Sequence, residues 1–142
     1  MSIEELLKVG SINRFKATQE EISRAIEIAR RDLVFAESIF KQNLDWSYVV
    51  AYNAVLQAGR AYMFSLGYRP AATGGHKAVF EFLQLNVDES LNESISYFDR
   101  VRRKRHRTVY DEVGLITEKE VKNLLKRVRE FISYVESSLR VS

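Results

Sequence analysis

The feature that most constrains the fold is a helical period of apolar residues that recurs along most of the chain. Two helix starts carry capping boxes, Thr18-Gln-Glu-Glu21 and Thr117-Glu-Lys-Glu120, in which a hydroxyl and a carboxylate bind otherwise unpaired backbone N–H groups. After each box, apolar residues recur at three- and four-residue spacing, as one buried helix face requires. The only proline, Pro70, and every glycine except Gly59 fall between the periodic stretches. The sequence therefore predicts an all-α fold.

The periodic stretches predict a compact four- to five-helix bundle of the up-and-down type, with short connections. The expected helices cover residues 18–40, 43–66 (capped by Asn43 or Asp45), 76–85, a stretch after Asp88 that runs into a basic segment, and a last helix from Thr117. No stretch alternates with period two for long enough to predict a β-sheet. The side chains expected in the core include Phe40, Phe98, Leu124 and Phe131.

The domain organisation is simple, because 142 residues fit one domain and no linker or internal repeat divides the chain. Residues 1–17 are interpreted as an N-terminal extension or short helix over residues 2–9, and residues 18–142 as the helical domain. A hydrophobic content of 46% supplies a real core.

The composition also bears on the cellular compartment. Cysteine is absent, which excludes disulfides and thiolate chemistry. The polar, acidic N-terminus does not resemble a secretory signal. The most apolar stretch, residues 46–66, contains Asn53, Gln57 and Arg60 and is a poor membrane span. We expect a cytoplasmic protein without membrane contact.

Positive charge is concentrated in residues 100–107, which hold six cations and no acidic residue: Arg100, Arg102, Arg103, Lys104, Arg105 and Arg107. The whole chain has 22 basic and 19 acidic residues, so the remainder holds 16 basic and 19 acidic residues, a net charge of −3. A local cluster of this kind indicates a binding site for an anion, whereas a uniformly basic surface would indicate general adhesion to polyanions.

Within this segment, Arg105 falls where the helical pattern requires an apolar residue. The stripe Leu91, Ile95, Phe98 and Val101 leads directly to its position. A lone buried guanidinium is costly, so we expect this face to open into a cleft, a subunit interface or a set of acidic partners.

His106 and Tyr110 add groups that can take part in chemistry. His106 lies about one turn from Arg102 and Arg103, whose charges disfavour the protonated imidazole. An arginine with a neutral histidine could cut RNA, with the histidine taking the 2′-hydroxyl proton and the guanidinium stabilising charge on the phosphate. The alternative interpretation is a solvated charged face, a surface histidine and a packing tyrosine.

The sequence resembles the HEPN domains (higher eukaryotes and prokaryotes nucleotide-binding) over roughly residues 18–140. The resemblance rests on Ala51-Tyr-Asn-Ala54, on Gly67-Tyr-Arg-Pro70 followed by Gly75-His76, and above all on Arg102-Arg-Lys-Arg-His-Arg-Thr-Val-Tyr-Asp111. It implies a helical bundle that pairs as a two-fold dimer with a polar motif from each protomer in a shared cleft. Many such domains are metal-independent ribonucleases, some act beside a nucleotidyltransferase antitoxin, and many have no active motif.

The family motif is an arginine, often followed by a polar residue, with a histidine four to six residues beyond. In the best-matching register, Arg105 corresponds to the motif arginine, His106 to the polar residue and Tyr110 to the histidine position. A phenol, with a reference pKa of about 10, is a poor base at pH 7, so this register implies weak or no ribonuclease activity. A looser register pairs Arg100 with His106.

Other classes of site are not expected. With two histidines and no cysteine, the chain offers no metal constellation, and it carries no phosphate-loop or dinucleotide fingerprint. Gly74-Gly75-His76 at a helix start could offer backbone N–H groups to a phosphate, or could simply be a flexible entry. We expect no metal and no cofactor.

Three functional hypotheses follow. The first is a homodimeric module that binds RNA or a nucleotide, in a toxin–antitoxin-like pair with a nucleotidyltransferase. Its candidate residues are Arg105, His106 and Tyr110 for any chemistry, and Arg100, Arg102, Arg103 and Arg107 for phosphates. The second is an active ribonuclease toxin, and the third is a structural protein–protein interaction domain.

Overall fold

Helices make up most of the chain. The structure, a computed structural model, describes residues 1–72, 75–110 and 113–141, without the side chains of residues 109, 110 and 141. Its elements, in chain order, are α1 (Ile3–Lys8), β1 (Ile12–Arg14), α2 (Gln19–Ser38), α3 (Leu44–Ser65), β2 (Tyr68–Pro70), α4 (Gly75–Asn86), a single 3₁₀ turn η1 (Glu89–Leu91), α5 (Asn92–Tyr110) and α6 (Glu118–Val141).

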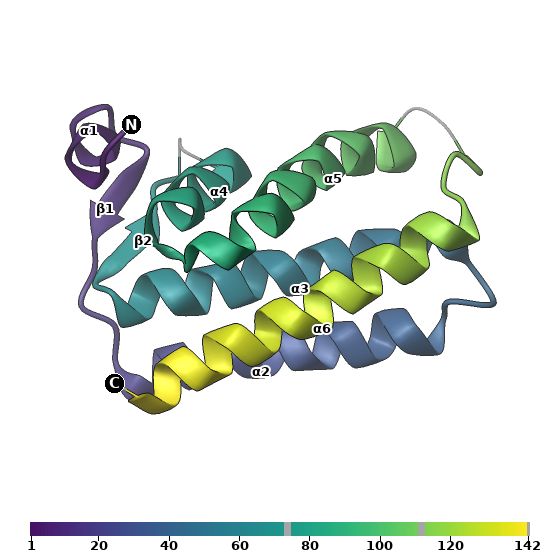
Figure 1. Cartoon of the computed structure of the whole chain (residues 1–142), viewed down its shortest axis with the longest axis horizontal. Helices are drawn as coiled ribbons and strands as arrows, with labels where there is room; N and C mark the ends of the chain where they lie inside the picture. The colour runs from purple at the N-terminus through teal and green to yellow at the C-terminus, as the bar shows by residue number, and fades with distance from the viewer. Residues whose placement is uncertain (73–74, 111–112, 142) are drawn as a thin grey trace.

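The bundle is built around α3, which contacts α2, α4, α5 and α6. In Figure 1, α2, α3 and α6 run side by side along the long axis, and α4 and α5 lie together on one side of α3. Small residues let neighbouring helices approach α3 closely: Ala51, Ala54, Ala58 and Ala61 are all fully buried. The predicted all-α helical bundle is therefore confirmed, with α2 to α6 as its five helices and α1 as the short N-terminal helix.

The helix starts follow the predicted capping chemistry. Thr18 Oγ1 accepts the N–H of Glu21, and the Glu21 carboxylate accepts the N–H of Thr18. Thr117 and Glu120 form the same reciprocal pair at the start of α6. Of the two residues proposed to cap α3, Asn43 is the N-cap, since its side chain accepts the N–H of Trp46. Each cap satisfies backbone donors that a helix start leaves unpaired.

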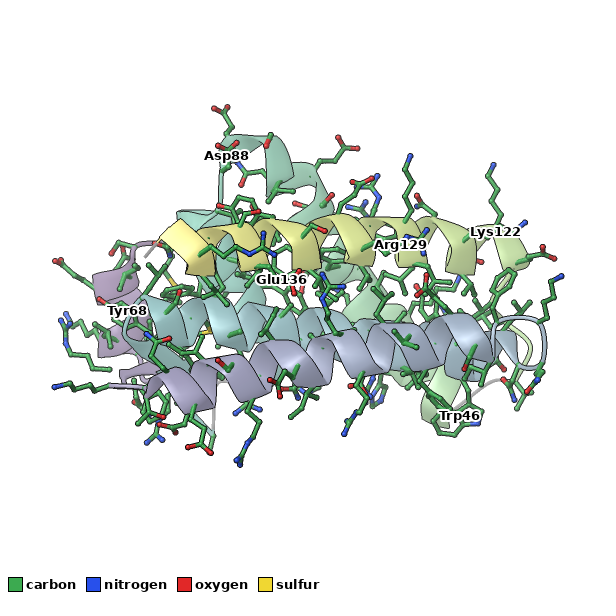
Figure 2. The ribbon with its side chains drawn as sticks, turned by 90° about the horizontal axis from the view of Figure 1, so that it is seen from below. Trp46, Tyr68, Asp88, Lys122, Arg129 and Glu136 are labelled. Atoms are coloured by element: carbon green, nitrogen blue, oxygen red, sulfur yellow. The ribbon has the colours of Figure 1, made fainter. Side chains whose placement is uncertain are left out.

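Ion pairs cross the outer seam between α2 and α6. Figure 2 shows Arg129 and Glu136 on α6, next to α2. Arg129 donates to Glu37 of α2 at 2.6 Å, and Arg30 of α2 pairs with Glu136. These pairs are partly exposed, so each contributes on the order of 1 kcal/mol or less. The apolar core is the main source of stability.

The core agrees with the apolar stripes except at one predicted position. Phe98, Leu124 and Phe131 are fully buried, and the rings of Phe98 and Phe131 meet with their centroids 5.7 Å apart. Phe40 is only partly buried. It lies beyond Ser38, where α2 ends, so the helical period no longer directs its side chain inward.

The prediction of no β-sheet is wrong for six residues. β1 and β2 form a two-stranded antiparallel ladder in which Ile12 pairs with Pro70 and Arg14 with Tyr68. The N–H of Phe15 also donates to the carbonyl of Gly67 at 2.8 Å. Strands of three residues are too short for alternation to be visible in a sequence, and their partners lie more than fifty residues apart. The ladder fixes the N-terminal segment against the end of α3.

Candidate functional site

The cations of α5 do not form one continuous charged face. Arg102 and Arg103 both donate to Asp99, one turn earlier, at 2.9 and 3.1 Å. Lys104 pairs with Glu120 of α6. Arg102, Arg103 and Lys104 therefore each have a carboxylate partner within the chain.

The other predicted site residues of α5 occupy different places. Arg100 is exposed, with its guanidinium carbon 5.8 Å from the centroid of the Tyr97 ring. It lines a hollow beside α6, whereas His106 lines a different cleft, so the two residues of the looser register border different hollows. Arg107 is exposed. Tyr110 ends α5, and its side chain lies outside the described residues.

A cationic cleft opens between the start of α4 and the second half of α5. We call it the α4–α5 cleft; its volume is about 550 Å³, and its lining residues are Gly75, His76, Lys77, Arg102, Arg103, Arg105 and His106. None of the described residues that line it is acidic. The carboxylate of Asp99, on the same helix, already accepts from Arg102 and Arg103. The cleft is suited to an anion.

Arg105 is the residue of this cleft whose charge is least compensated. Its guanidinium carbon lies 5.3 Å from the centroid of the Tyr52 ring on α3. Its Nε is buried and has no hydrogen-bond partner among the described residues, and none of the ion pairs in that part of the chain includes it. Of the three environments expected for this off-pattern arginine, the protomer provides a cleft. A buried donor without a partner costs about 1–3 kcal/mol.

Tyr52 also holds a histidine from the next helix. Its hydroxyl lies 3.0 Å from Nδ1 of His76, which is the second residue of α4. Tyr52 is fully buried, and among the described residues its hydroxyl hydrogen-bonds to His76 alone. Donation to Nδ1 satisfies this buried donor, whereas accepting from an Nδ1–H would leave the hydroxyl proton unpaired. We therefore assign the proton of neutral His76 to Nε2, which makes that nitrogen a donor.

Burial and charge keep this pair in its neutral form. Burial, and then the positive charges of Arg105, Arg102 and Arg60, lower the pKa of His76. Burial raises the pKa of the Tyr52 phenol, and this effect is larger than the lowering of that pKa by the charge of Arg105. At pH 7 the site is thus two neutral hydrogen-bonding groups among arginines.

The lowered pKa of His76 predicts a pH-dependent stability. The folded-state pKa lies below the unfolded value of 6.5, so the unfolded chain binds this proton more readily as the pH falls. The unfolding free energy should therefore decrease from pH 7 to pH 5, and His76→Gln should make that decrease smaller. Urea unfolding at both pH values tests this; the same decrease in the wild type and the variant would contradict it.

The position of His76 depends on a close contact between α3 and α4. Gly59 is the one glycine inside a predicted helix, and a Cβ at this position would lie 2.8 Å from Cγ1 of Val79 and 3.2 Å from Cδ1 of Leu83. The absence of a side chain therefore lets α4 lie directly on α3. This contact brings the start of α4, with His76, over Tyr52.

The pairing of Tyr52 with His76 was not anticipated from the sequence. The two residues are 24 positions apart, and each alone looks like an ordinary helical residue. The available signals were the unusual Gly59 and the Gly-Gly-His helix start, neither of which specifies a partner. Gly74 of that motif lies outside the described residues.

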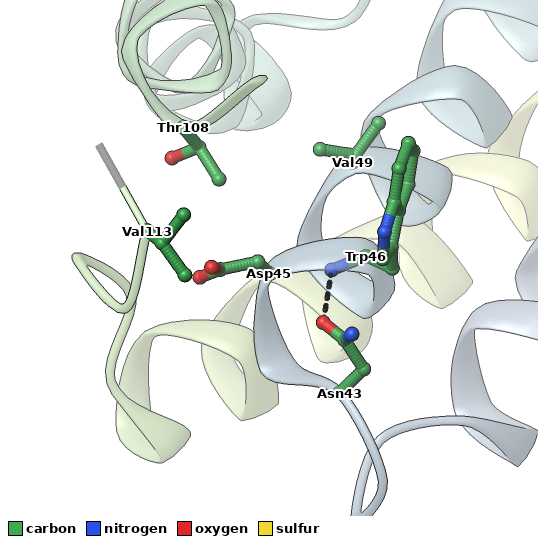
Figure 3. Close-up of a pocket in the computed structure, with 6 residues that line it drawn as sticks. All are labelled: Asn43, Asp45, Trp46, Val49, Thr108 and Val113. Atoms are coloured by element: carbon green, nitrogen blue, oxygen red, sulfur yellow. Dashed lines mark hydrogen bonds between the residues drawn. The ribbon is translucent and has the colours of Figure 1, made fainter. Parts of the chain in front are cut away.

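A second hollow, near the start of α3, has a structural explanation. Figure 3 shows Asp45 directed toward Val113 and Thr108, with Trp46 and Val49 on the far side. The Asp45 carboxylate accepts the N–H of Gly114 at 2.9 Å, which ties the connection before α6 to α3. A carboxylate in the lining of this hollow does not suit a phosphate.

Neither a metal site nor a membrane-spanning helix is found in the described residues. No group of three or more His, Cys, Asp or Glu residues there could hold a metal ion. Within the same residues, none of the helices combines the length and apolar character that a membrane span needs.

Comparisons with known proteins agree with this architecture. A family model described as HEPN domain matches residues 22–138. The crystal structure of TT1696 from Thermus thermophilus is similar, with a TM-score of 0.66 and 20% sequence identity, covering 82% of this chain and 96% of that chain. At that identity the likeness shows a common fold alone. A comparison with curated protein sequences finds no match.

Proposed function

The chain belongs to the HEPN domain family, and we propose that it is a nucleic-acid- or nucleotide-binding module whose α4–α5 cleft holds phosphate groups. The observation that carries this proposal is Arg105, a partly buried guanidinium with no carboxylate partner among the described residues and with an unsatisfied Nε. An arginine without a partner in its own chain can donate hydrogen bonds to an anion that binds from outside.

The other groups of the cleft fit the same ligand. Lys77 and Arg103 are exposed at its edge. Arg102 supplies further positive charge, although it shares Asp99 with Arg103. Neutral His76, with its proton on Nε2, offers a hydrogen-bond donor rather than a base. Phosphate oxygens accept from all of these groups, and RNA presents them in series.

The same tautomer argues against the alternative of an active ribonuclease toxin. A general base needs a free lone pair, and in His76 the Nδ1 lone pair is used by Tyr52. His106 lines the cleft beside Arg105 on the same helix, and the best-matching register places Tyr110 where active relatives carry histidine. Incubation with RNA in the absence of metal decides between the two: robust cleavage lost in His106→Ala would establish the ribonuclease.

The finer parts of the proposal concern assembly. We propose a homodimer that acts with a nucleotidyltransferase, as the family resemblance implies, and a cytoplasmic location, as the composition indicates. A monomer mass in sedimentation equilibrium at tens of micromolar would exclude the dimer. A structural interaction domain remains the third hypothesis; its acidic protein partner would compete with RNA for the same cleft.

The binding mode predicts a specific salt dependence. If three of the cleft cations contact phosphates, the slope of log affinity against log salt should be about −2 for single-stranded RNA. Fluorescence anisotropy with a labelled single-stranded RNA measures it. Lys77→Gln with Arg103→Gln should flatten the slope to about −0.7, because one contact then remains.

A matched control removes the same charge elsewhere. Arg31 and Lys122 are exposed on α2 and α6, outside the cleft, and their double replacement by glutamine should leave the slope near the wild-type value. Absence of RNA binding by the wild type at low salt would contradict the proposal.

A further inference from the structure

A second cationic hollow lies between the two-stranded ladder and the bundle. We call it the ladder cleft; it has a volume of about 330 Å³ and lies against α2, α3, β2 and the residue that follows β1. Its charged, polar and aromatic lining residues are Phe15, Glu21, Arg24, Gln57, Arg60, Phe64 and Arg69. It has no described lining residue in common with the α4–α5 cleft.

Aromatic rings hold two of these arginines in place. The guanidinium carbon of Arg69 lies 4.8 Å from the centroid of the Phe15 ring, and that of Arg60 lies 5.6 Å from the centroid of the Phe64 ring. The two rings meet edge to face at 5.1 Å. A guanidinium stacked on a ring keeps its in-plane N–H groups available for an acceptor.

The donors of these two arginines are not used within the described part of the chain. The Nε of Arg60 is buried without a hydrogen-bond partner, and neither Arg60 nor Arg69 forms an ion pair among the described residues. A buried donor of this kind is costly unless a ligand satisfies it. The two guanidinium groups are therefore held in place by the rings, while their hydrogen-bond donors still lack an acceptor among the described residues.

The remaining charges of the cleft leave a positive excess. Arg24 pairs with Glu20 at 3.2 Å. Glu21 is the only acidic residue among the described lining residues, and its carboxylate accepts the N–H of Thr18 in the capping box. An anion therefore meets two guanidinium groups that have no ion-pair partner among the described residues, with one carboxylate and two phenyl rings beside them.

We propose that the ladder cleft is a second ligand site that binds a phosphate group, of a free nucleotide or of a nucleic-acid strand. A phosphate has enough oxygens to accept from Arg60 and Arg69 together, and arginine matches it with paired donors. The phenyl rings of Phe15 and Phe64 provide an apolar wall for the attached nucleoside. This site requires neither the α4–α5 cleft nor the function proposed for it.

The buried Nε–H of Arg60 is a specific reporter of occupancy. Protein labelled with ¹⁵N-arginine is titrated with sodium phosphate, 5′-AMP or an eight-nucleotide oligouridylate, at constant ionic strength. The Arg60 Nε–Hε resonance, assigned from its loss in Arg60→Lys, should shift saturably. A response to inorganic phosphate identifies the phosphate itself, whereas a response restricted to 5′-AMP or to the oligonucleotide identifies its source.

Variants separate this site from the first cleft. Arg69 is exposed, so Arg69→Gln should fold normally and weaken the fitted affinity at least about fivefold, the loss of one of two charge-assisted contacts. Arg31→Gln, on α2 outside the hollow, should leave it unchanged, and Arg105→Met should weaken RNA binding at the other cleft without affecting the phosphate response. An unmoved Arg60 resonance with all three ligands would overturn the proposal, as would an equal response to sodium acetate.

Discussion

Replacing Arg105 with methionine should weaken the binding of single-stranded RNA by about ten- to a hundredfold. A hydrogen bond to a charged group contributes about 1.5–3 kcal/mol, which corresponds to that range of dissociation constants. The unfolding free energy should change by less than about 1 kcal/mol, because the lost stacking on Tyr52 is offset by removing an unsatisfied buried Nε. Anisotropy titrations and urea unfolding of the same preparations measure both quantities.

The chain offers a close control for this substitution. Arg127 of α6 also stacks on a tyrosine, at 4.7 Å from the Tyr97 ring centroid, and also has a buried Nε without a partner among the described residues. It lies outside the α4–α5 cleft. Arg127→Met removes the same charge and should reduce RNA affinity by less than about threefold, a long-range effect that salt screens. Equal losses for the two variants would show that net charge, and not the cleft, determines binding.

Replacing Phe98 with alanine should destabilise the fold by about 3–5 kcal/mol. Phe98 of α5 is fully buried, and its ring contacts those of Tyr97 on the same helix and Phe131 on α6. The substitution leaves a cavity at the place where α5 meets the rest of the bundle. A domain of this size has a total stability of about 5–15 kcal/mol, so the midpoint of urea unfolding should shift greatly.

An exposed phenylalanine provides the comparison. Phe35 on α2 is 53% exposed, and Phe35→Ala should change the unfolding free energy by less than about 1 kcal/mol. A loss below about 1 kcal/mol for Phe98→Ala would contradict the packing described for α5.

The fold was predictable wherever local chemistry and burial agree. Thr18, Asn43 and Thr117 cap the helices that they were expected to cap, because an N-cap needs only residues within one turn. The β1–β2 ladder was missed because its pairing joins residues 12–14 to residues 68–70, and no local signal encodes that distance. Phe40 was misplaced because the apolar period continues in the sequence after α2 has ended.

The candidate site was predictable in part for the same reason. Arg105 was identified because it breaks a regular stripe on one helix, which is a local observation. The contribution of Tyr52 and His76 depends on how α3, α4 and α5 pack, and therefore on Gly59. The neutralisation of Lys104 by Glu120 depends on the packing of α6 in the same way.

The location of RNA on the surface tests the central proposal most directly. Backbone ¹H–¹⁵N resonances of the full chain are followed while an eight-nucleotide oligouridylate is added at low salt. The largest shifts should fall on residues 75–77 and 102–106, the two segments that line the α4–α5 cleft. Binding that leaves these amides unmoved, or no binding at all, would contradict the account.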